Sequence, residues 1–189
     1  NNREELNETI EKSYDSGYPE KLIIQDMIPG NDEYMYVLTS YSDQSGKVVM
    51  MCLGNVLLEA HTPLGKGNHA VIITDRNEEL MRQAREFLEN IHYVGFSNFD
   101  IKYDYRDGKY KFFEINTRQG RSNYYVTASG FNVARYLVDD YIYNKDMDLE
   151  LSKDPYLWTV VPDWVALKYV KQEENVKQII QLIDEGKEV

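Results

Sequence analysis

The sequence predicts an α+β fold, with a largely antiparallel sheet, helices packed on one face and a helical extension after it. Three observations predict this fold: two pairs of strand-like segments, each joined by a short polar turn, and one helix-like segment with an apolar stripe. The strand pairs span residues 34–41 with 47–58 and 99–105 with 109–116, and the helix follows Asp75. Strands joined by tight turns run antiparallel, which is why the sheet is expected to be so.

Composition limits the classes of function. The 189 residues are 28% charged and 42% hydrophobic, as in globular proteins and unlike disordered ones. The formal net charge of -11 argues against nucleic acid or an anionic membrane as a partner. The single cysteine, Cys52, allows no internal disulfide and is expected in a reducing cytoplasm. No apolar run approaches the roughly 20 residues of a membrane span.

The first predicted elements are a helix and a strand. Leu6, Ile10 and Tyr14 recur at four-residue spacing and predict a short amphipathic helix within residues 1–17. The run over residues 22–28 is rich in isoleucine and predicts a strand, which ends at a Pro-Gly pair. Both elements precede the first predicted hairpin.

A polar loop follows the first hairpin. It spans residues 61–69, is flanked by glycine and contains one lysine, so it is suited to close over a ligand. Its His61 and His69, like His92 further on, have no carboxylate or cysteine at metal-ligand spacing. We therefore predict structural or solvent-exposed roles for these histidines.

The helix after this loop is predicted from its start signal and its stripe. Asp75 is the predicted N-cap, and Glu78 follows three residues later, as in a capping box. The apolar stripe consists of Leu80, Ala84, Phe87, Leu88 and Ile91. This helix is expected to pack on the sheet.

The second hairpin has a predicted register. Its turn is expected to be Arg106-Asp107-Gly108, with Gly108 in the left-handed conformation, so that Tyr105 pairs with Lys109. Each step away from the turn then adds one residue on both strands. The register therefore determines which side chains face each other.

This register places Asp100 directly opposite Glu114, with Cβ atoms about 5 Å apart. Strand alternation places Asn116 and Arg118 on the same face. Facing carboxylates repel unless a cation lies between them, and the Asn116 amide oxygen is a third hard ligand. A magnesium ion that carries nucleotide phosphates fits this set, and the Arg118 guanidinium can hold a transferring phosphoryl group. The alternative is a solvated face with incidental charges.

Lys102 lies on the same predicted face, opposite Phe112. There its methylene groups can lie against Phe112 and a base, while its ammonium group reaches a phosphate. The alternative is a surface pair with Asp104, and the two readings are equally open.

The rest of the chain is predicted to be mainly helical. A flexible turn that contains Arg121 leads into a helix over residues 125–143, so Arg121 is expected near the charged face. It can hold a substrate carboxylate there, with a surface ion pair as the alternative. An acidic stretch after residue 144 predicts a boundary between a core of residues 1–144 and a helical extension of residues 145–189.

The second hairpin resembles the metal-binding signature of the ATP-grasp superfamily. That signature is an acidic residue, a tight turn and Glu-x-Asn-x-Arg, here Asp100 followed by Glu114, Asn116 and Arg118. The chain looks most like the carboxylate-amine ligases related to D-aspartate ligase and the carbamoyl-phosphate synthase large chain. The resemblance implies that Asp100, Glu114 and Asn116 bind Mg²⁺, or Mn²⁺, with ATP, and that Arg118 steadies the phosphoryl group. Many members have Glu in place of Asp100, so direct or water-mediated binding by Asp100 stays open.

The resemblance also implies further binding residues. Gln25, Asp26, Met27 and Ile28 resemble the hinge whose backbone pairs with adenine, and Glu33, or failing it Asp32, is placed to hold the ribose hydroxyls. An ordinary strand and turn with solvated acids is the alternative. Lys66 lies in the segment that borders the acceptor substrate in similar ligases, and Lys102 lies where many members pack an apolar residue on adenine.

The implied activity is an ATP- and Mg²⁺-dependent ligation of a small-molecule carboxylate to an amine through an acyl phosphate. Biotin-carboxylase-like or carbamoyl-phosphate-synthase-like chemistry is the alternative among enzymes, and a non-catalytic nucleotide-binding module is the alternative outside them. Residues 1–19 lack the lysine-bearing strand and glycine-rich loop that precede this region in similar enzymes. We therefore expect the chain to be the C-terminal part of a longer ligase and to be inactive by itself.

Overall fold

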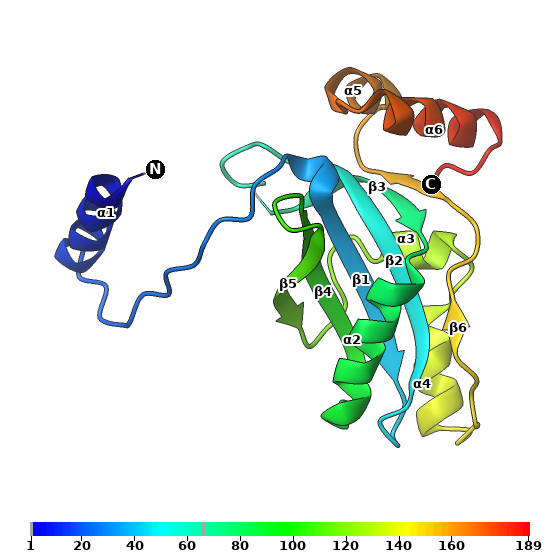
Figure 1. The fold of residues 1–189 in the computed structure, drawn as a ribbon. Coiled ribbons are helices and arrows are strands. Elements are labelled where there is room, and N and C mark those ends of the chain that lie inside the picture. Colours follow the sequence, from blue (N-terminus) through cyan, green and yellow to red (C-terminus); the bar gives the residue numbers. More distant parts are fainter. Residues whose placement is uncertain (1, 66) are drawn as a thin grey trace.

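The computed structural model describes residues 2–65 and 67–189, with a seven-stranded sheet at its centre (Figure 1). The strands are β1 (Met35–Ser42), β2 (Val48–Glu59), β3 (His69–Asp75), β4 (Gly95–Asp104), β5 (Lys109–Asn116), β6 (Glu150–Leu151) and β7 (Leu157–Thr159). Their order is β5-β4-β1-β2-β3-β7, and β6 pairs with β2 beside this path. The β2 and β6 strands run parallel, and the other pairings are antiparallel. The predicted α+β class and antiparallel hairpins are confirmed.

Helices cover both faces of the sheet, and not one face as predicted. The described helices are α1 (Arg3–Asp15), the 3₁₀ turn η1 (Asp32–Tyr34), α2 (Glu78–Asn90), α3 (Tyr124–Ala128), α4 (Val133–Tyr141), α5 (Asp163–Tyr169) and α6 (Glu173–Asp184). One face packs against α2, whereas the other packs against α3 and α4 (Figure 1). Within the described part of the chain, no helix is long and apolar enough to cross a membrane.

Neighbouring residues of β1 show why both faces are buried. The side chain of Val37 packs in one cluster with Tyr125 of α3, and that of Leu38 packs in another cluster with Leu80 of α2. Both β1 side chains are fully buried. An unbroken apolar run, rather than an alternating one, is what a strand covered on both faces requires.

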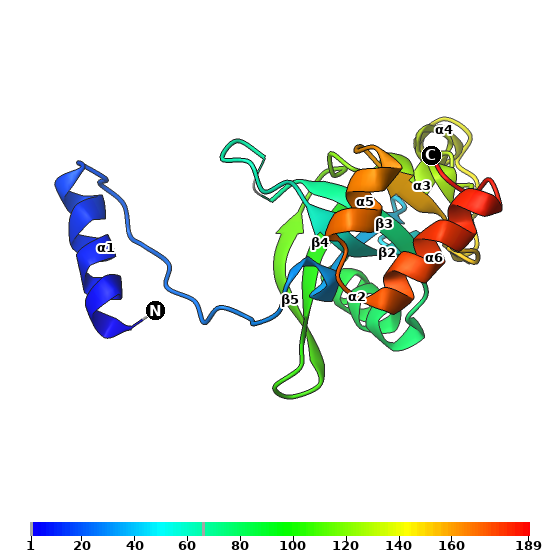
Figure 2. The same ribbon diagram turned by 90° about the horizontal axis from the view of Figure 1, so that it is seen from above.

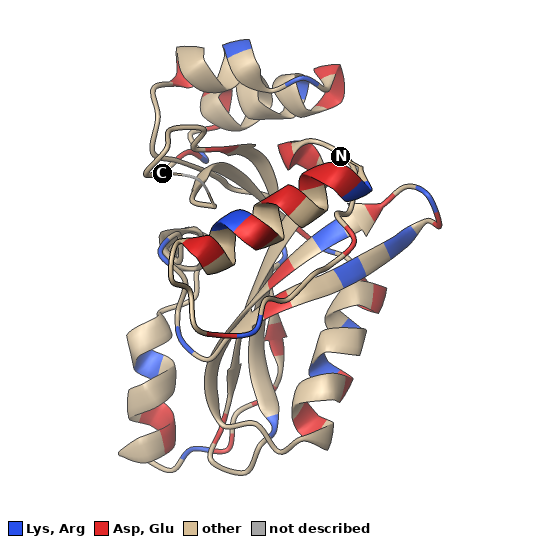
Figure 3. Cartoon of the chain, turned by 90° about the vertical axis from the view of Figure 1, so that its left-hand side faces the viewer, with Lys and Arg blue, Asp and Glu red and all other residues tan. Residues whose placement is uncertain are grey.

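The α1 helix lies away from the sheet, at the far end of an irregular segment (Figures 1 and 2). Asn2 and Glu5 form a capping box at its start, and the chain turns at Gly17 with a φ of +84°. The predicted helix is therefore confirmed. Its Leu6 and Tyr14 are 40% and 50% exposed, and acidic side chains predominate along it (Figure 3).

Residues 22–28 do not form the predicted strand. They are irregular, and Ile23, Ile24 and Met27 are 85%, 60% and 72% exposed. A strand needs a neighbour for its backbone hydrogen bonds, and the edges of this sheet are β5 and β7, with β1 enclosed by β2 and β4. The apolar composition of this segment led to the prediction of a strand, but composition alone does not supply a pairing partner.

Two helix predictions change in detail. The helix predicted over residues 125–143 is divided into α3 and α4 at Gly130, whose φ of +95° is left-handed and ends a helix. The N-cap of α2 is Asn77, whose side chain accepts a hydrogen bond from the Leu80 N–H at 3.0 Å. Asp75, the predicted cap, is instead the last residue of β3.

The β4–β5 hairpin has a longer turn than predicted. Asp104, and not Tyr105, pairs with Lys109, so that residues 105–108 form the turn. The Asp104 carboxylate accepts hydrogen bonds from the backbone N–H of Arg106 at 3.0 Å and from its guanidinium at 2.9 and 2.8 Å. These hydrogen bonds stabilise a turn in which Tyr105 has no partner in the β4–β5 pairing.

A β-bulge compensates for the longer turn. Ile101 pairs with Phe112 and Asp100 pairs with Glu114, so Phe113 has no partner between them. The extra residue on β5 cancels the one-residue difference at the turn. The predicted pair of carboxylates is therefore confirmed, although the register nearer the turn is wrong.

Residues 145–189 do more than form a helical extension. They contribute β6 and β7 to the sheet, and α5 and α6 pack against β3 and β7. Ile179 and Leu182 of α6 are buried in this cluster with Val71 and Leu157. The sheet therefore continues across the predicted boundary.

Glu33 connects the start of α6 to the rest of the fold through hydrogen bonds. Its side chain is buried, and its carboxylate accepts hydrogen bonds from the backbone N–H groups of Lys171 and Gln172 at 2.8 and 2.9 Å. It also accepts one from the Asn175 amide at 2.8 Å. Gln172 makes no side-chain cap, so a carboxylate from a distant element supplies it.

Candidate functional site

The charged face of the β4–β5 hairpin lines a cleft of about 300 Å³. Asp100, Glu114, Asn116, Arg118 and Arg121 all line this cleft. The first three come from the paired strands, and the two arginines come from the chain between β5 and α3. The structure therefore brings together the residues predicted to contact the metal, the phosphoryl group and the substrate carboxylate.

Asp100 and Glu114 face each other across the paired strands, and both line the cleft. The Asp100 side chain is 19% exposed, whereas Glu114 is exposed. Burial, then the charges of Glu114 and Glu59, raise the pKa of Asp100 to about 6, and Arg118 opposes this rise. The ionised pair is therefore held at an electrostatic cost that a bound cation would relieve.

The donor set fits a hard divalent cation. Asp100 and Glu114 offer carboxylate oxygens and Asn116 offers an amide oxygen, which are the ligands that Mg²⁺ prefers. Among the described residues, no group of three or more His, Cys, Asp or Glu side chains is arranged to hold a metal ion. Any ion here would need the Asn116 amide, phosphate oxygens or water to complete its coordination, as is usual for Mg²⁺.

Glu59 is an acidic neighbour that sequence reasoning missed. It ends β2, and burial, then the charge of Asp32, raises its pKa, while His61 and Lys102 lower it. Its charge is also one cause of the raised Asp100 pKa. The position of Glu59 at the end of a long apolar strand could have marked it in the sequence. Only the order of strands in the sheet shows that it lies near β4.

His69 lines the cleft, although we predicted a structural or exposed role for it. Its side chain is 10% exposed, and its Nε2 lies 3.9 Å from Asp100 Oδ1. Burial lowers its pKa to about 4, so the imidazole is neutral at pH 7. Its Nδ1 is buried without a hydrogen-bond partner among the described residues.

A buried polar cluster holds the turn between β5 and α3 in place. The Thr39 hydroxyl lies 3.1 Å from Asn98 Oδ1 and 2.9 Å from Asn123 Oδ1. The Asn123 oxygen also accepts a hydrogen bond from the Gly120 N–H at 3.3 Å. A Cβ at Gly120 would lie 2.8 Å from Asn98 Oδ1, so the turn requires glycine for this close approach.

The residues predicted to contact adenine lie outside the cleft. Gln25, Asp26 and Met27 are exposed and Ile28 is half-buried in the irregular segment before η1. Asp26 forms an ion pair with Arg106 of the β4–β5 turn at 3.0 Å. The segment therefore lies beside the hairpin.

The residues predicted to hold ribose have other partners. Glu33 is bound to the start of α6 and lines a different pocket. Asp32 Oδ2 accepts a hydrogen bond from the Glu59 N–H at 2.8 Å and lies 2.8 Å from His61 Nε2. The structure does not bring either acid into the cleft.

Lys102 lies opposite Lys111, so the predicted pairing with Phe112 is wrong. The longer turn shifts the register by one residue, and the bulge at Phe113 restores it only beyond Lys102. Its Nζ donates a hydrogen bond to the Gly30 carbonyl at 2.8 Å, and not to Asp104. By strand alternation it still shares the face of Asp100. Lys66, predicted to contact the acceptor, lies outside the described residues.

The raised pKa of Asp100 predicts how stability depends on pH. Its pKa is 3.8 ordinarily and about 6 in the fold, so the folded chain binds this proton more tightly. The stabilisation of the fold by this proton is complete below about pH 4 and is lost as pH rises through about 6. We expect Asp100→Asn to raise the melting temperature at about pH 7.5 without divalent cations and to change it little near pH 4. A lower melting temperature at the higher pH would contradict this cause.

Comparison with known proteins identifies relatives of this chain. The family described as carbamoyl-phosphate synthase L chain, ATP binding domain, matches residues 1–138. D-aspartate ligase of Enterococcus faecium (strain Aus0004) is 44% identical over 190 residues, covering 98% of this chain and 45% of the ligase. The chain therefore spans less than half of the length of this relative.

Solved structures with a similar arrangement include carboxylase domains. The biotin carboxylase domain of thermophilic 2-oxoglutarate carboxylase, bound to bicarbonate, has a TM-score of 0.47 at 17% identity, over 74% of this chain and 32% of that one. Kluyveromyces lactis urea carboxylase has a TM-score of 0.48 at 11% identity, over 65% of this chain and 11% of that one. On the family match and the sequence identity to the ligase, this chain belongs to the carbamoyl-phosphate synthase L chain ATP-binding family of the ATP-grasp superfamily.

Proposed function

We propose that this chain is the metal- and phosphate-binding part of an ATP- and Mg²⁺-dependent ligase that joins a carboxylate to an amine. The observation that carries the proposal is the pair Asp100 and Glu114, which face each other in a cleft with Asn116, Arg118 and Arg121. The identity to D-aspartate ligase supports ligation, and D-aspartate is the first carboxylate to test.

The side chains of the cleft suit the two steps of such a reaction. A carboxylate oxygen attacks the γ-phosphorus and ADP leaves; the amine nitrogen then attacks the acyl carbon, and phosphate leaves as the nitrogen loses a proton. Arg118 stabilises the charge of the transferring phosphoryl group, and Arg121 holds the substrate carboxylate. Asp100, Glu114 and Asn116 would hold Mg²⁺, which would neutralise phosphate charge.

The remaining predicted contacts belong to the same proposal. The segment 25–28 contacts adenine through its backbone, and Lys102 exchanges the Gly30 carbonyl for a phosphate. Of the two acids predicted to hold ribose, Asp32 takes this role after it exchanges its hydrogen bond from the Glu59 N–H, because Glu33 is buried against the start of α6. Lys66 contacts the acceptor. Biotin-carboxylase-like chemistry and a non-catalytic nucleotide-binding module are the alternatives. Phosphate release in a screen of carboxylates, amines and bicarbonate distinguishes the three.

We expect Mg²⁺ or Mn²⁺ to stabilise this chain, and Glu114→Gln to remove most of that effect. A ligand that binds only the folded state at about ten times its Kd adds about 1.4 kcal/mol, a measurable shift in melting temperature. Thermal melts with and without the cation and ADP provide the measurement. Glu11→Gln on α1, far from the cleft, is the matched control. Equal responses of the wild type and Glu114→Gln would show that the paired carboxylates do not bind the metal.

A further inference from the structure

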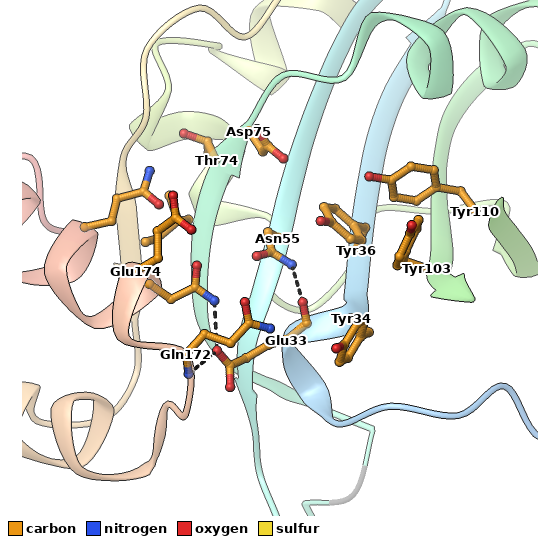
Figure 4. A pocket seen from close by; sticks show the side chains of 13 residues that line it. Glu33, Tyr34, Tyr36, Asn55, Thr74, Asp75, Tyr103, Tyr110, Gln172 and Glu174 are labelled. Atoms are coloured by element: carbon orange, nitrogen blue, oxygen red, sulfur yellow. Dashed lines mark hydrogen bonds between the residues drawn. The ribbon is translucent and has the colours of Figure 1, made fainter. Parts of the chain in front are cut away.

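A second pocket lies on the opposite face of the sheet from the cleft. It encloses about 350 Å³ between the sheet and α6 (Figure 4). Tyr103 of β4 lines it, and strand alternation places Tyr103 on the opposite face from Asp100. Tyr36 pairs with Ile101 and lines the same pocket. The pocket is therefore separated from the metal and phosphate residues by the sheet itself.

Tyrosine rings form one wall of this pocket. The rings of Tyr103 and Tyr110 are 5.1 Å apart, those of Tyr36 and Tyr110 are 5.2 Å apart, and Tyr34 stacks with Tyr103 at 6.3 Å. Figure 4 shows all four on the same side of the pocket. Burial, then Tyr110, raises the pKa of Tyr36, so its hydroxyl stays protonated. The wall is thus aromatic, uncharged and able to form hydrogen bonds.

Amide and carboxylate side chains form the opposite wall and the rim. Asn175 and Gln178 lie three residues apart on α6, so that their amides share one face, and the N-cap residue Gln172 lines the pocket beside them. Glu174 accompanies them, and Asp75 lies at the end of β3 (Figure 4). The Glu33 carboxylate is occupied by its three hydrogen bonds to the start of α6.

The charges of the pocket have one sign. Of the lining residues that the structure describes, none is Lys, Arg or His, whereas Asp75 and Glu174 are carboxylates. The field of Asp75 reaches the wall, since its charge contributes to the raised pKa of Tyr36. An anionic ligand would be repelled by these charges, whereas a cation would be attracted.

We propose that this pocket binds a ligand with a primary ammonium group on an apolar stem. An ammonium has three donors, which the carboxylates and amide oxygens can accept, and the tyrosine faces attract a cation while they cover its stem. The site lies on the face opposite the cleft and does not depend on the proposed ligation. It gives this chain a second binding site, for an amine.

Titration of the ¹⁵N-labelled chain with butylammonium chloride tests this proposal by NMR. We expect saturable shifts of the backbone signals of Tyr36 and Asn55 and of the Asn175 side-chain amide. Butan-1-ol and butyrate, which share the stem but lack the positive charge, should bind at least tenfold more weakly. The double variant Asp75→Asn/Glu174→Gln should bind butylammonium at least tenfold more weakly than the wild type.

Two controls keep the result specific. Glu173→Gln removes an adjacent acid of α6 that does not line the pocket, so it should bind like the wild type. Glu114→Gln should also leave binding unchanged, which separates this proposal from the proposed function. Absence of saturable binding, equal affinity for butan-1-ol, undiminished affinity of the double variant, or shifts confined to the Asp100 cleft would each overturn it.

Discussion

Replacing Arg118 with alanine is expected to lower the turnover of ATP-dependent ligation by about a hundredfold or more, measured in the full-length gene product. The guanidinium lies in the cleft of Asp100 and Glu114, and its charge already lowers the pKa of Asp100. It is exposed and donates a hydrogen bond to the adjacent Gln119 carbonyl at 3.1 Å, so its removal should cost the fold little. A group that stabilises charge developing in the transition state affects turnover more than nucleotide affinity.

Steady-state kinetics and nucleotide binding should be measured on the same preparations. Arg135→Ala on α4, where Arg135 pairs with Asp139 at 3.2 Å, removes an exposed arginine away from the cleft and should retain wild-type turnover. If Arg118→Ala loses nucleotide affinity and turnover by the same factor, Arg118 is a ground-state contact. If neither changes, Arg118 has no part in the reaction.

Replacing Glu33 with alanine is expected to lower the free energy of unfolding by about 3 kcal/mol. Hydrogen bonds to a charged group contribute about 1.5 to 3 kcal/mol, and donors left unpaired in a buried site cost more than an exposed pair would. Glu33 accepts three such bonds at 2.8 to 2.9 Å from the start of α6. Urea unfolding provides the measurement, and faster hydrogen exchange in α6 should accompany the loss.

The matched control for Glu33→Ala is Glu173→Ala. Glu173 is an exposed acid in the first turn of α6, so its removal loses only a weak interaction with the helix dipole, about 0.5 kcal/mol. Equal losses in the two variants would mean that the Glu33 contacts contribute no more than a surface charge. They would also mean that α6 is held mainly by the apolar cluster of Ile179 and Leu182.

The opposed carboxylates were predictable because strand alternation and pairing act locally. Asp100 and Glu114 do face each other, although the turn is longer than predicted and a bulge at Phe113 compensates. The extra residue in the turn and the extra residue at the bulge shift the register in opposite directions, so the two errors cancel. The bulge carries no strong local signal, because Phe112, Phe113 and Ile115 are all apolar and suit either register.

Residues 22–28 show the opposite outcome. Their composition favours a strand, yet they have no strand beside them and are largely exposed. Strand formation depends on a partner that can be distant in the chain, and composition does not contain that information.

The sequence by itself determined the α+β class, both hairpins and the grouping of Asp100, Glu114, Asn116, Arg118 and Arg121, because these depend on periodicities and short turns within one stretch of chain. Only the tertiary structure decided which distant residues join them. The order of strands in the sheet brings His69 into the cleft and the charge of Glu59 close enough to raise the pKa of Asp100, and Glu33 binds α6 far along the chain. Such contacts follow from packing between elements, which no local pattern encodes.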